Sequence, residues 1–282
     1  MKYIIIFLFT FTLLFPLYWM FQGSFQDIGG LIKVPPNWIP RQPTVMNYIE
    51  WARVSTKGHD FWGKHPDALL RWTFNTFAIF GLKCGVGILL VATAGYAFAV
   101  YNFRWKNALF IIFIIGIFIG PGITIIPHFV NVKRLGISGT WWAVILPGAY
   151  TPVGVYMFRN YVETIPYALI DSARIDGAGE FKILFRIMMP LCLPVIGVIV
   201  VLTALGTLQD YIWTLLMVPE MPKTTLMVGI IQTLFQYQMI GSGRNPIGMA
   251  LAGGVILFMP LFLVFIFCQK FFIKGLTLGG IK

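Results

Sequence analysis

Six long apolar runs constrain what this chain can fold into more than any other feature of its sequence. Each is close to or above the roughly 20 residues that an α-helix needs to cross the hydrocarbon core of a bilayer. Charged residues make up only 11% of the 282 residues, whereas soluble domains carry about 25%. The sequence therefore predicts an all-α membrane protein with six transmembrane helices, over residues 3–21, 74–101, 109–130, 140–158, 191–215 and 249–271.

A seventh apolar run, residues 224–243, differs from the others because it contains glutamines at 232, 236 and 238. Lipid penalises such polar groups, so we interpret this run as a re-entrant or interfacial helix on the outer side. The first run follows Lys2, as in a signal peptide, but it is longer than a typical signal sequence core and lacks a small-residue cleavage site. We therefore predict that it is retained as an anchor.

The positions of Lys and Arg predict the orientation, because short cytoplasmic loops are enriched in basic residues. With the N-terminus inside, the inner segments hold ten basic residues and the short outer loops hold four. A seventh span would place Lys270, Lys274 and Lys282 outside, so we predict that both termini are cytoplasmic. The expected organisation is a first transmembrane helix (1–21), an extracytoplasmic loop (22–73) and a five-helix core (74–282) with a cytoplasmic loop at 160–190.

Composition also argues against two other kinds of function. The net charge of +11 comes from cations dispersed between apolar runs, whereas nucleic-acid binding needs them clustered on one face. His59 and His65 in the outer loop have neither a helical register nor a second ligand pair, and we expect them on a solvated or partner-docking surface. The cysteines lie inside apolar runs without metal-ligand spacing. We therefore predict no nucleic-acid partner and no metal site.

The segment from Ile165 to Pro194 is charged and interrupted by glycine, although it lies between two predicted spans. Pro166 suits a helix N-terminus, and Tyr167–Ile175 is predicted to be a short helix. Gly177 and Gly179 should end it, because glycine costs about 1 kcal/mol inside a helix and admits positive φ.

A second short helix is predicted directly after these glycines. Its apolar residues follow the i, i+3, i+4, i+7 spacing of one helical stripe: Phe181, Leu184, Phe185 and Met188. Two interpretations are compatible with this pattern. The segment is either a rigid elbow that transmits movement from a soluble motor to the spans, or an amphipathic helix lying on the lipid surface.

The same segment resembles the cytoplasmic EAA loop of binding-protein-dependent ABC importer permeases. In that family the pattern is Glu-Ala-Ala, two further residues, Asp-Gly-Ala, then a Phe and a closing Pro. The matching residues here are Asp171, Ser172, Ala173, Asp176, Gly177, Ala178, Phe181 and Pro190. Asp171 departs from the usual Glu and Ser172 from the usual Ala, which alters the salt-bridge geometry that the family loop implies.

Other motifs extend the resemblance to most of the chain from about Asn75 onward, and they are similar to carbohydrate permeases of the maltose-transporter type, specifically the second permease subunit. These motifs are Gly95-Tyr96-Ala97-Phe98-Ala99 with Phe103-Arg104, Pro121 with Pro127, Leu205-Gly206 with Asp210-Tyr211-Ile212-Trp213, and the tail from Phe271 to Gly279.

The resemblance implies the fold of an ABC type I importer permease in the bacterial plasma (inner) membrane. It also implies a second homologous permease, two copies of a cytoplasmic ABC ATPase, an extracytoplasmic solute-binding protein and a carbohydrate substrate. The chain has no Gly-x-x-x-x-Gly-Lys-Ser/Thr phosphate loop. We therefore expect a non-catalytic subunit without a cofactor of its own, with ATP and Mg²⁺ bound by the partner ATPase.

Three residues are candidates for the translocation pathway: Lys83, Asp210 and Trp213. Charges within a membrane are costly and often functional, but Lys83 is also compatible with snorkelling and Asp210 with capping a helix near the interface. A secondary transporter or channel is the alternative function. It would need intramembrane carboxylates and, commonly, inverted repeats; only Asp210 approaches that requirement.

Overall fold

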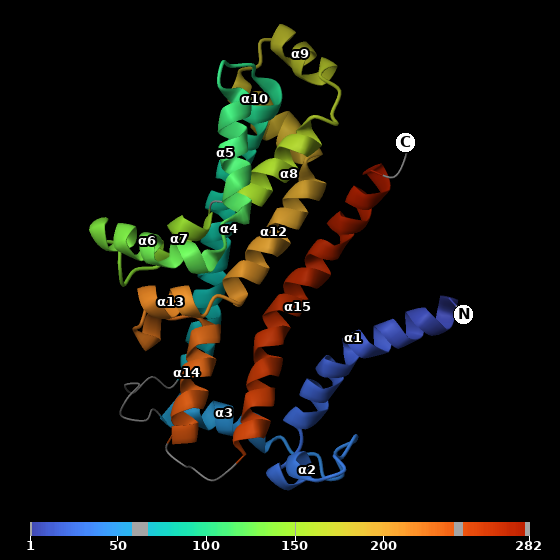
Figure 1. Ribbon diagram of the computed structural model, residues 1–282, viewed down its shortest axis with the longest axis vertical. Coiled ribbons are helices and arrows are strands. Elements are labelled where there is room, and N and C mark those ends of the chain that lie inside the picture. The colour runs from blue at the N-terminus through green and yellow to red at the C-terminus, as the bar shows by residue number, and fades with distance from the viewer. Residues whose placement is uncertain (1, 58–66, 150, 240–244, 280–282) are drawn as a thin grey trace. The chain divides into compact units, whose positions relative to one another are not determined.

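The computed structural model is helical in the part of the chain that it describes, residues 2–57, 67–149, 151–239 and 245–279 (Figure 1). The helices form two compact units. Unit 1 comprises Met1–Asn75 and Glu220–Phe262, and unit 2 comprises Thr76–Pro219 and Leu263–Lys282. His59 and His65 lie outside the described residues, so the interpretation of that part of the outer loop stays a prediction.

Unit 1 is built around two buried tryptophans. Its elements are α1 (Lys2–Ser24), α2 (Ile28–Ile32), α3 (Met46–Lys57), the start of α4 (Ala68–Val100), η2 (Met221–Lys223), α14 (Leu226–Met239) and most of α15 (Pro246–Gly279). The indole N–H of Trp51 donates to the carbonyl of Met249 at 2.9 Å, and that of Trp72 donates to the carbonyl of Met221 at 2.8 Å. These bonds satisfy both buried indoles and tie α3 and α4 to the C-terminal segments.

The glutamine-containing run becomes α14, which packs inside unit 1. Leu226 and Ile230 on one face of α14 join the same buried cluster as Trp51 and Trp72. The helix is also shorter than a bilayer span requires. The side chains of Gln232 and Gln236 on the same helix are half-buried.

Unit 2 holds the rest of the helices, and Figure 1 shows α9 and α10 at one end of it and α6, α7 and α13 toward the other. Its elements after α4 are α5 (Lys106–Phe118), α6 (Pro121–Arg134), α7 (Trp142–Ala149), α8 (Pro152–Val162), α9 (Ala168–Ile175), α10 (Glu180–Ile183), η1 (Leu184–Met188), α11 (Met189–Leu191), α12 (Leu193–Leu208) and α13 (Ile212–Met217). One apolar cluster joins α4, α8, α9, α10 and α12, and a second joins α4, α6, α7 and α13.

The long apolar runs are more broken than the sequence predicts. The run 109–130 is divided into α5 and α6, which meet at an angle of 109°. Gly120 is extended there, and Pro121 has no N–H to continue the hydrogen bonds of α5. The prediction of one uninterrupted helix over 109–130 is therefore wrong.

Two further runs are also divided. The run 140–158 is shared by α7 and α8, and α8 begins at a Thr151 side chain that accepts from the N–H of Gly154 at 2.8 Å. The run 191–215 becomes α12 and α13. Among the described residues, three helices are long and apolar enough to cross a bilayer, or five if each bent pair is one span. The count of six therefore stays a prediction.

Small residues let α4 approach α7 and α8 closely. A Cβ atom added at Gly87 would lie 2.7 Å from the carbonyl oxygen of Ala149, and one added at Gly95 would lie 2.9 Å from the ring of Phe158. Close backbone approach through glycine is common between membrane helices. By contrast, nothing lies within 4 Å of a Cβ added at Gly81 or Gly85.

Alanine should therefore have opposite effects at these two pairs of α4 glycines. Gly87→Ala and Gly95→Ala are expected to lower the melting temperature, because the added methyl groups meet the backbone of Ala149 and the buried ring packed on α8. Gly81→Ala and Gly85→Ala should be neutral or stabilising, because alanine is favoured over glycine in a helix by about 1 kcal/mol. Tryptophan fluorescence of the purified chain in detergent measures this, and equal shifts at all four positions would contradict it.

Candidate functional site

Helix α9 ends in a Schellman motif, which explains four residues of the loop pattern. The N–H of Ala178 donates to the carbonyl of Ala173 at 2.9 Å, and the N–H of Gly177 donates to the carbonyl of Arg174 at 3.0 Å. Gly177 adopts a φ of 76°, the left-handed conformation that this motif places one residue after the C-cap, here Asp176. Ala173, Asp176, Gly177 and Ala178 thus form the predicted helix stop, and α9 ends at the predicted residue.

The second half of the loop departs from the predicted stripe. Leu184 and Met188 are buried as expected, but Phe181 is 75% exposed and Phe185 is 40% exposed, while Ile183 is fully buried. The reason is that α10 continues as a π-helix, in which the N–H of the following Met189 donates to the carbonyl of Leu184, five residues back. This wider turn changes which side chains share a face, so the predicted 3.6-residue stripe is wrong for the two phenylalanines.

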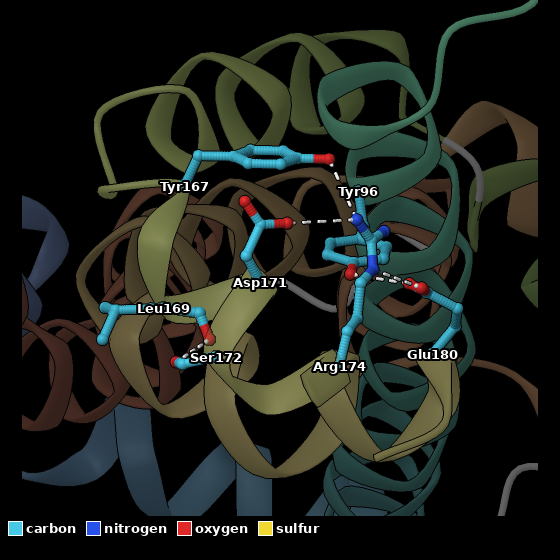
Figure 2. Close-up of polar contacts among 7 residues, drawn as sticks. All are labelled: Tyr96, Tyr167, Leu169, Asp171, Ser172, Arg174 and Glu180. Carbon is cyan, nitrogen blue, oxygen red and sulfur yellow. Dashed lines mark hydrogen bonds and ion pairs between the residues drawn. The ribbon is translucent and has the colours of Figure 1, made fainter. Parts of the chain in front are cut away.

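A network of polar side chains joins the two halves of the loop (Figure 2). Arg174 donates from Nε to Oε1 of Glu180 at 2.8 Å and from Nη1 to the hydroxyl of Tyr167 at 3.1 Å, and it lies 3.6 Å from a carboxylate oxygen of Asp171. The hydroxyl of Tyr96 on α4 donates to the other carboxylate oxygen of Glu180 at 3.0 Å. A single carboxylate thereby links α9, α10 and α4.

The charges in this network stabilise one another's ionised forms. The hydrogen bond from Arg174 lowers the pKa of Glu180, and the same bond raises the pKa of Arg174. Burial and a hydrogen bond to Glu180 raise the pKa of nearby Tyr101. The Arg174 and Glu180 side chains are 32% and 39% exposed, and solvent-exposed ion pairs contribute only about 0–1 kcal/mol. The network therefore positions the loop more than it stabilises the fold.

Large apolar side chains remain exposed on this otherwise polar loop. Ile175 is 86% exposed and Phe181 is 75% exposed. The ring of Phe185 stacks on that of Phe181, with centroids 6.5 Å apart. Phe181 belongs to the predicted site, whereas Ile175 does not. Its position between two charged residues is the signal that would have identified it. We call Ile175, Phe181 and Phe185 the exposed apolar residues of the loop.

The remaining loop residues of the predicted site lie on either side of this group. Asp171 and Ser172 are exposed on α9, and the Ser172 hydroxyl donates to the carbonyl of Leu169 at 3.1 Å within the same helix. Pro190 is exposed in α11, directly after the π-helix. The eight loop residues therefore do not form one cluster. Four shape the turn, and the other four are exposed: Asp171, Ser172, Phe181 and Pro190.

The candidate pathway residues lie in unit 2, away from the loop. Lys83 on α4 is only 7% exposed and packs over Gly148 at the C-terminal end of α7. Asp210, in the turn between α12 and α13, is half-buried and attracts Lys83 electrostatically. The indole N–H of Trp213 donates to the carbonyl of Ala143 at 3.1 Å. The structure thus brings Lys83 and Asp210 into one electrostatic environment, while Trp213 ties α13 to α7.

Comparison with known proteins identifies the family. The model of the family described as "Binding-protein-dependent transport system inner membrane component" matches residues 87–277. This chain belongs to that family. The matched region includes the whole loop from α8 to α12 and the candidate pathway residue Asp210. The permease is accordingly a transport component of an inner membrane.

Two relatives and one solved structure extend the match to nearly the full permease. The arabinooligosaccharides transport system permease protein AraQ of Bacillus subtilis (strain 168) is 30% identical over 95% of this chain and 90% of its own length. AraQ of Halalkalibacterium halodurans is 32% identical over 97% and 92%. A chain of a bacterial ABC transporter involved in alginate import has a TM-score of 0.78 at 19% identity, covering 96% of this chain and 95% of that chain. The all-α fold of an ABC importer permease is therefore confirmed.

Proposed function

We propose that this permease forms the membrane pathway of an ATP-driven importer for a carbohydrate, most specifically an oligosaccharide. The observation that carries the proposal is the match, over nearly the full length of both chains, to two permeases named for arabinooligosaccharide transport. We further propose that a second homologous permease completes the pathway and that an extracytoplasmic binding protein delivers the substrate. The chain itself binds no cofactor, and ATP and Mg²⁺ are held by two copies of a cytoplasmic ABC ATPase.

The exposed apolar residues of the loop support its role as the ATPase-docking surface. Ile175 and Phe181 leave most of their apolar surface open, and burial of such a side chain contributes about 1.5–3 kcal/mol. Asp171 is exposed on the same helix as Ile175. Its carboxylate lies 3.6 Å from the Arg174 guanidinium, which is longer than a hydrogen bond, so it is open to a cation on the partner. An apolar centre with a charge at its rim is typical of protein interfaces.

The pathway proposal rests on Lys83 and Asp210. Both are more buried than charged side chains usually are, and they lie in unit 2 on segments distant in sequence. Their amine and carboxylate are groups that hydrogen-bond sugar hydroxyls. Trp213 supports this arrangement by fixing α13 to α7 through its hydrogen bond to Ala143.

Transport by the reconstituted complex tests the proposal. The permease, its partner permease and the ATPase would be placed in proteoliposomes with the binding protein outside and ATP inside. We expect labelled arabino-oligosaccharide or a related oligosaccharide to accumulate only when both ATP and the binding protein are present. Accumulation driven by an ion gradient, by the permease alone, would instead support the secondary transporter.

A further inference from the structure

The contact between Glu180 and Tyr96 joins the loop to a long apolar helix. Glu180 is the first residue of α10, and both of its carboxylate oxygens are used: Arg174 donates to one at 2.8 Å and the Tyr96 hydroxyl donates to the other at 3.0 Å. Tyr96 lies near the end of α4 and is only 3% exposed. Figure 2 shows these three side chains meeting between α4 and the two short helices of the loop.

Apolar packing alone would hold the loop less specifically. Ile170 on α9 and Ile183 on α10 are buried in the same cluster as Tyr96, but apolar contact is non-directional and allows small sliding movements. A hydrogen bond loses strength as soon as its donor and acceptor move apart or out of line. The bond from Tyr96 to Glu180, together with the bond from Tyr101 just after α4, therefore defines one position of the loop relative to the end of α4. Apolar burial alone allows a range of positions.

We propose that Tyr96, Glu180 and Arg174 act as a clamp through which movement of the loop is transmitted to α4. Arg174 fixes α9 to α10, and Glu180 fixes both to α4, so a displacement of the loop displaces the end of α4 with it. This inference rests on the proposed function, in which the ATPase moves the loop. It assigns to Tyr96 and Glu180 a positioning role, because they act through the loop and α4.

Removal of single polar groups tests the clamp in the complete transporter. Tyr96→Phe deletes only the donating hydroxyl and keeps the buried ring, and Glu180→Gln removes the charge from the acceptor. Tyr161→Phe is the matched control, because Tyr161 packs on the same cluster from α8 and takes no part in the clamp. The quantities measured are oligosaccharide moved per ATP hydrolysed and the amount of ATPase that co-purifies with the permease.

We expect Tyr96→Phe and Glu180→Gln each to lower the oligosaccharide moved per ATP by about fivefold or more, since hydrogen bonds to charged groups are the stronger ones. ATPase co-purification should stay within about twofold of wild type. The double variant should resemble Glu180→Gln alone, because that substitution already weakens the bond from Tyr96 and groups that share a bond are not additive. Glu180 is the more exposed residue of the Tyr96–Glu180 pair. Glu180→Gln therefore still reports the oligosaccharide moved per ATP if Tyr96→Phe inserts poorly.

Three outcomes would overturn the clamp and leave the proposed function intact. Unchanged transport per ATP in both variants would show that the bond transmits nothing. A parallel loss of ATPase co-purification would show that it only shapes the docking surface, and an equal loss in Tyr161→Phe would show a general effect of deleting a hydroxyl from this cluster. Absence of ATP-driven uptake by the wild-type complex would overturn the proposed function and the clamp together, which separates that failure from the other three.

Discussion

Aspartate in place of Ile175 or Phe181 is expected to detach the ATPase from the permease without preventing membrane insertion. Each substitution removes an apolar side chain worth about 1.5–3 kcal/mol when buried and places a carboxylate in an apolar contact, where desolvation opposes binding. Because 1.4 kcal/mol corresponds to a factor of ten in affinity, we expect at least a roughly tenfold loss of co-purified ATPase. Pull-down from detergent-solubilised membranes measures it.

Conservative variants at the same positions are the controls. Ile175→Val and Phe181→Leu keep an apolar surface and should retain most of the ATPase. Both wild-type side chains are largely exposed in the permease, so the aspartate variants should not lower the amount of inserted protein. If Ile175→Asp and Phe181→Asp both bound the ATPase as wild type does, the loop would not be the docking surface.

Gly177→Val is expected to abolish uptake, whereas Gly179→Val should be tolerated. Nothing lies within 4 Å of a Cβ added at either glycine, but Gly177 has a φ of 76° and Gly179 a φ of −71°. A side chain in the left-handed region costs about 1–2 kcal/mol, and a β-branched residue there is an outlier. Valine at 177 should therefore break the Schellman motif and reposition α10. ATP-driven uptake per inserted permease measures the effect.

Substitution with asparagine separates backbone strain from loss of contact. Asparagine visits the left-handed region more readily than other non-glycine residues, so Gly177→Asn should retain more uptake than Gly177→Ala or Gly177→Val. An order of activity that follows side-chain size equally at 177 and 179 would contradict the backbone explanation. That order would show that contact with a partner protein at this turn determines which side chains are tolerated.

Local features of the loop were predictable from the sequence because they depend on neighbouring residues. The end of α9 follows from Gly177, which adopts the left-handed conformation, and the helix ends at the predicted Ile175. Gly179, the second predicted breaker, instead lies at the start of α10. The exposure of Phe181 was not predictable in this way. The predicted apolar stripe depends on the α-helical spacing of about 3.6 residues per turn. Leu184–Met188 instead form a π-helix just before Pro190, so the predicted spacing fails there.

The broken span at 109–130 has a similar cause. Hydropathy measures how apolar a run is. It does not report whether the backbone of that run continues as one straight helix. Gly120 and Pro121 carried the signal for a break, but the 109° angle between α5 and α6 depends on how each packs in unit 2. Run length alone therefore predicts membrane residence better than it predicts the number of helices.

By itself the sequence determined that this chain is a membrane-embedded permease of the binding-protein-dependent family and where its helical loop turns. Run length, glycine conformation and motif spacing are properties of adjacent residues, so they can be read without coordinates. Only the tertiary structure decided that Tyr96 meets Glu180 across 84 positions of the chain, and that Ile175 stays exposed while Ile183 is buried. Burial and hydrogen bonding between distant segments depend on which helices pack together, and that is a property of the folded chain as a whole.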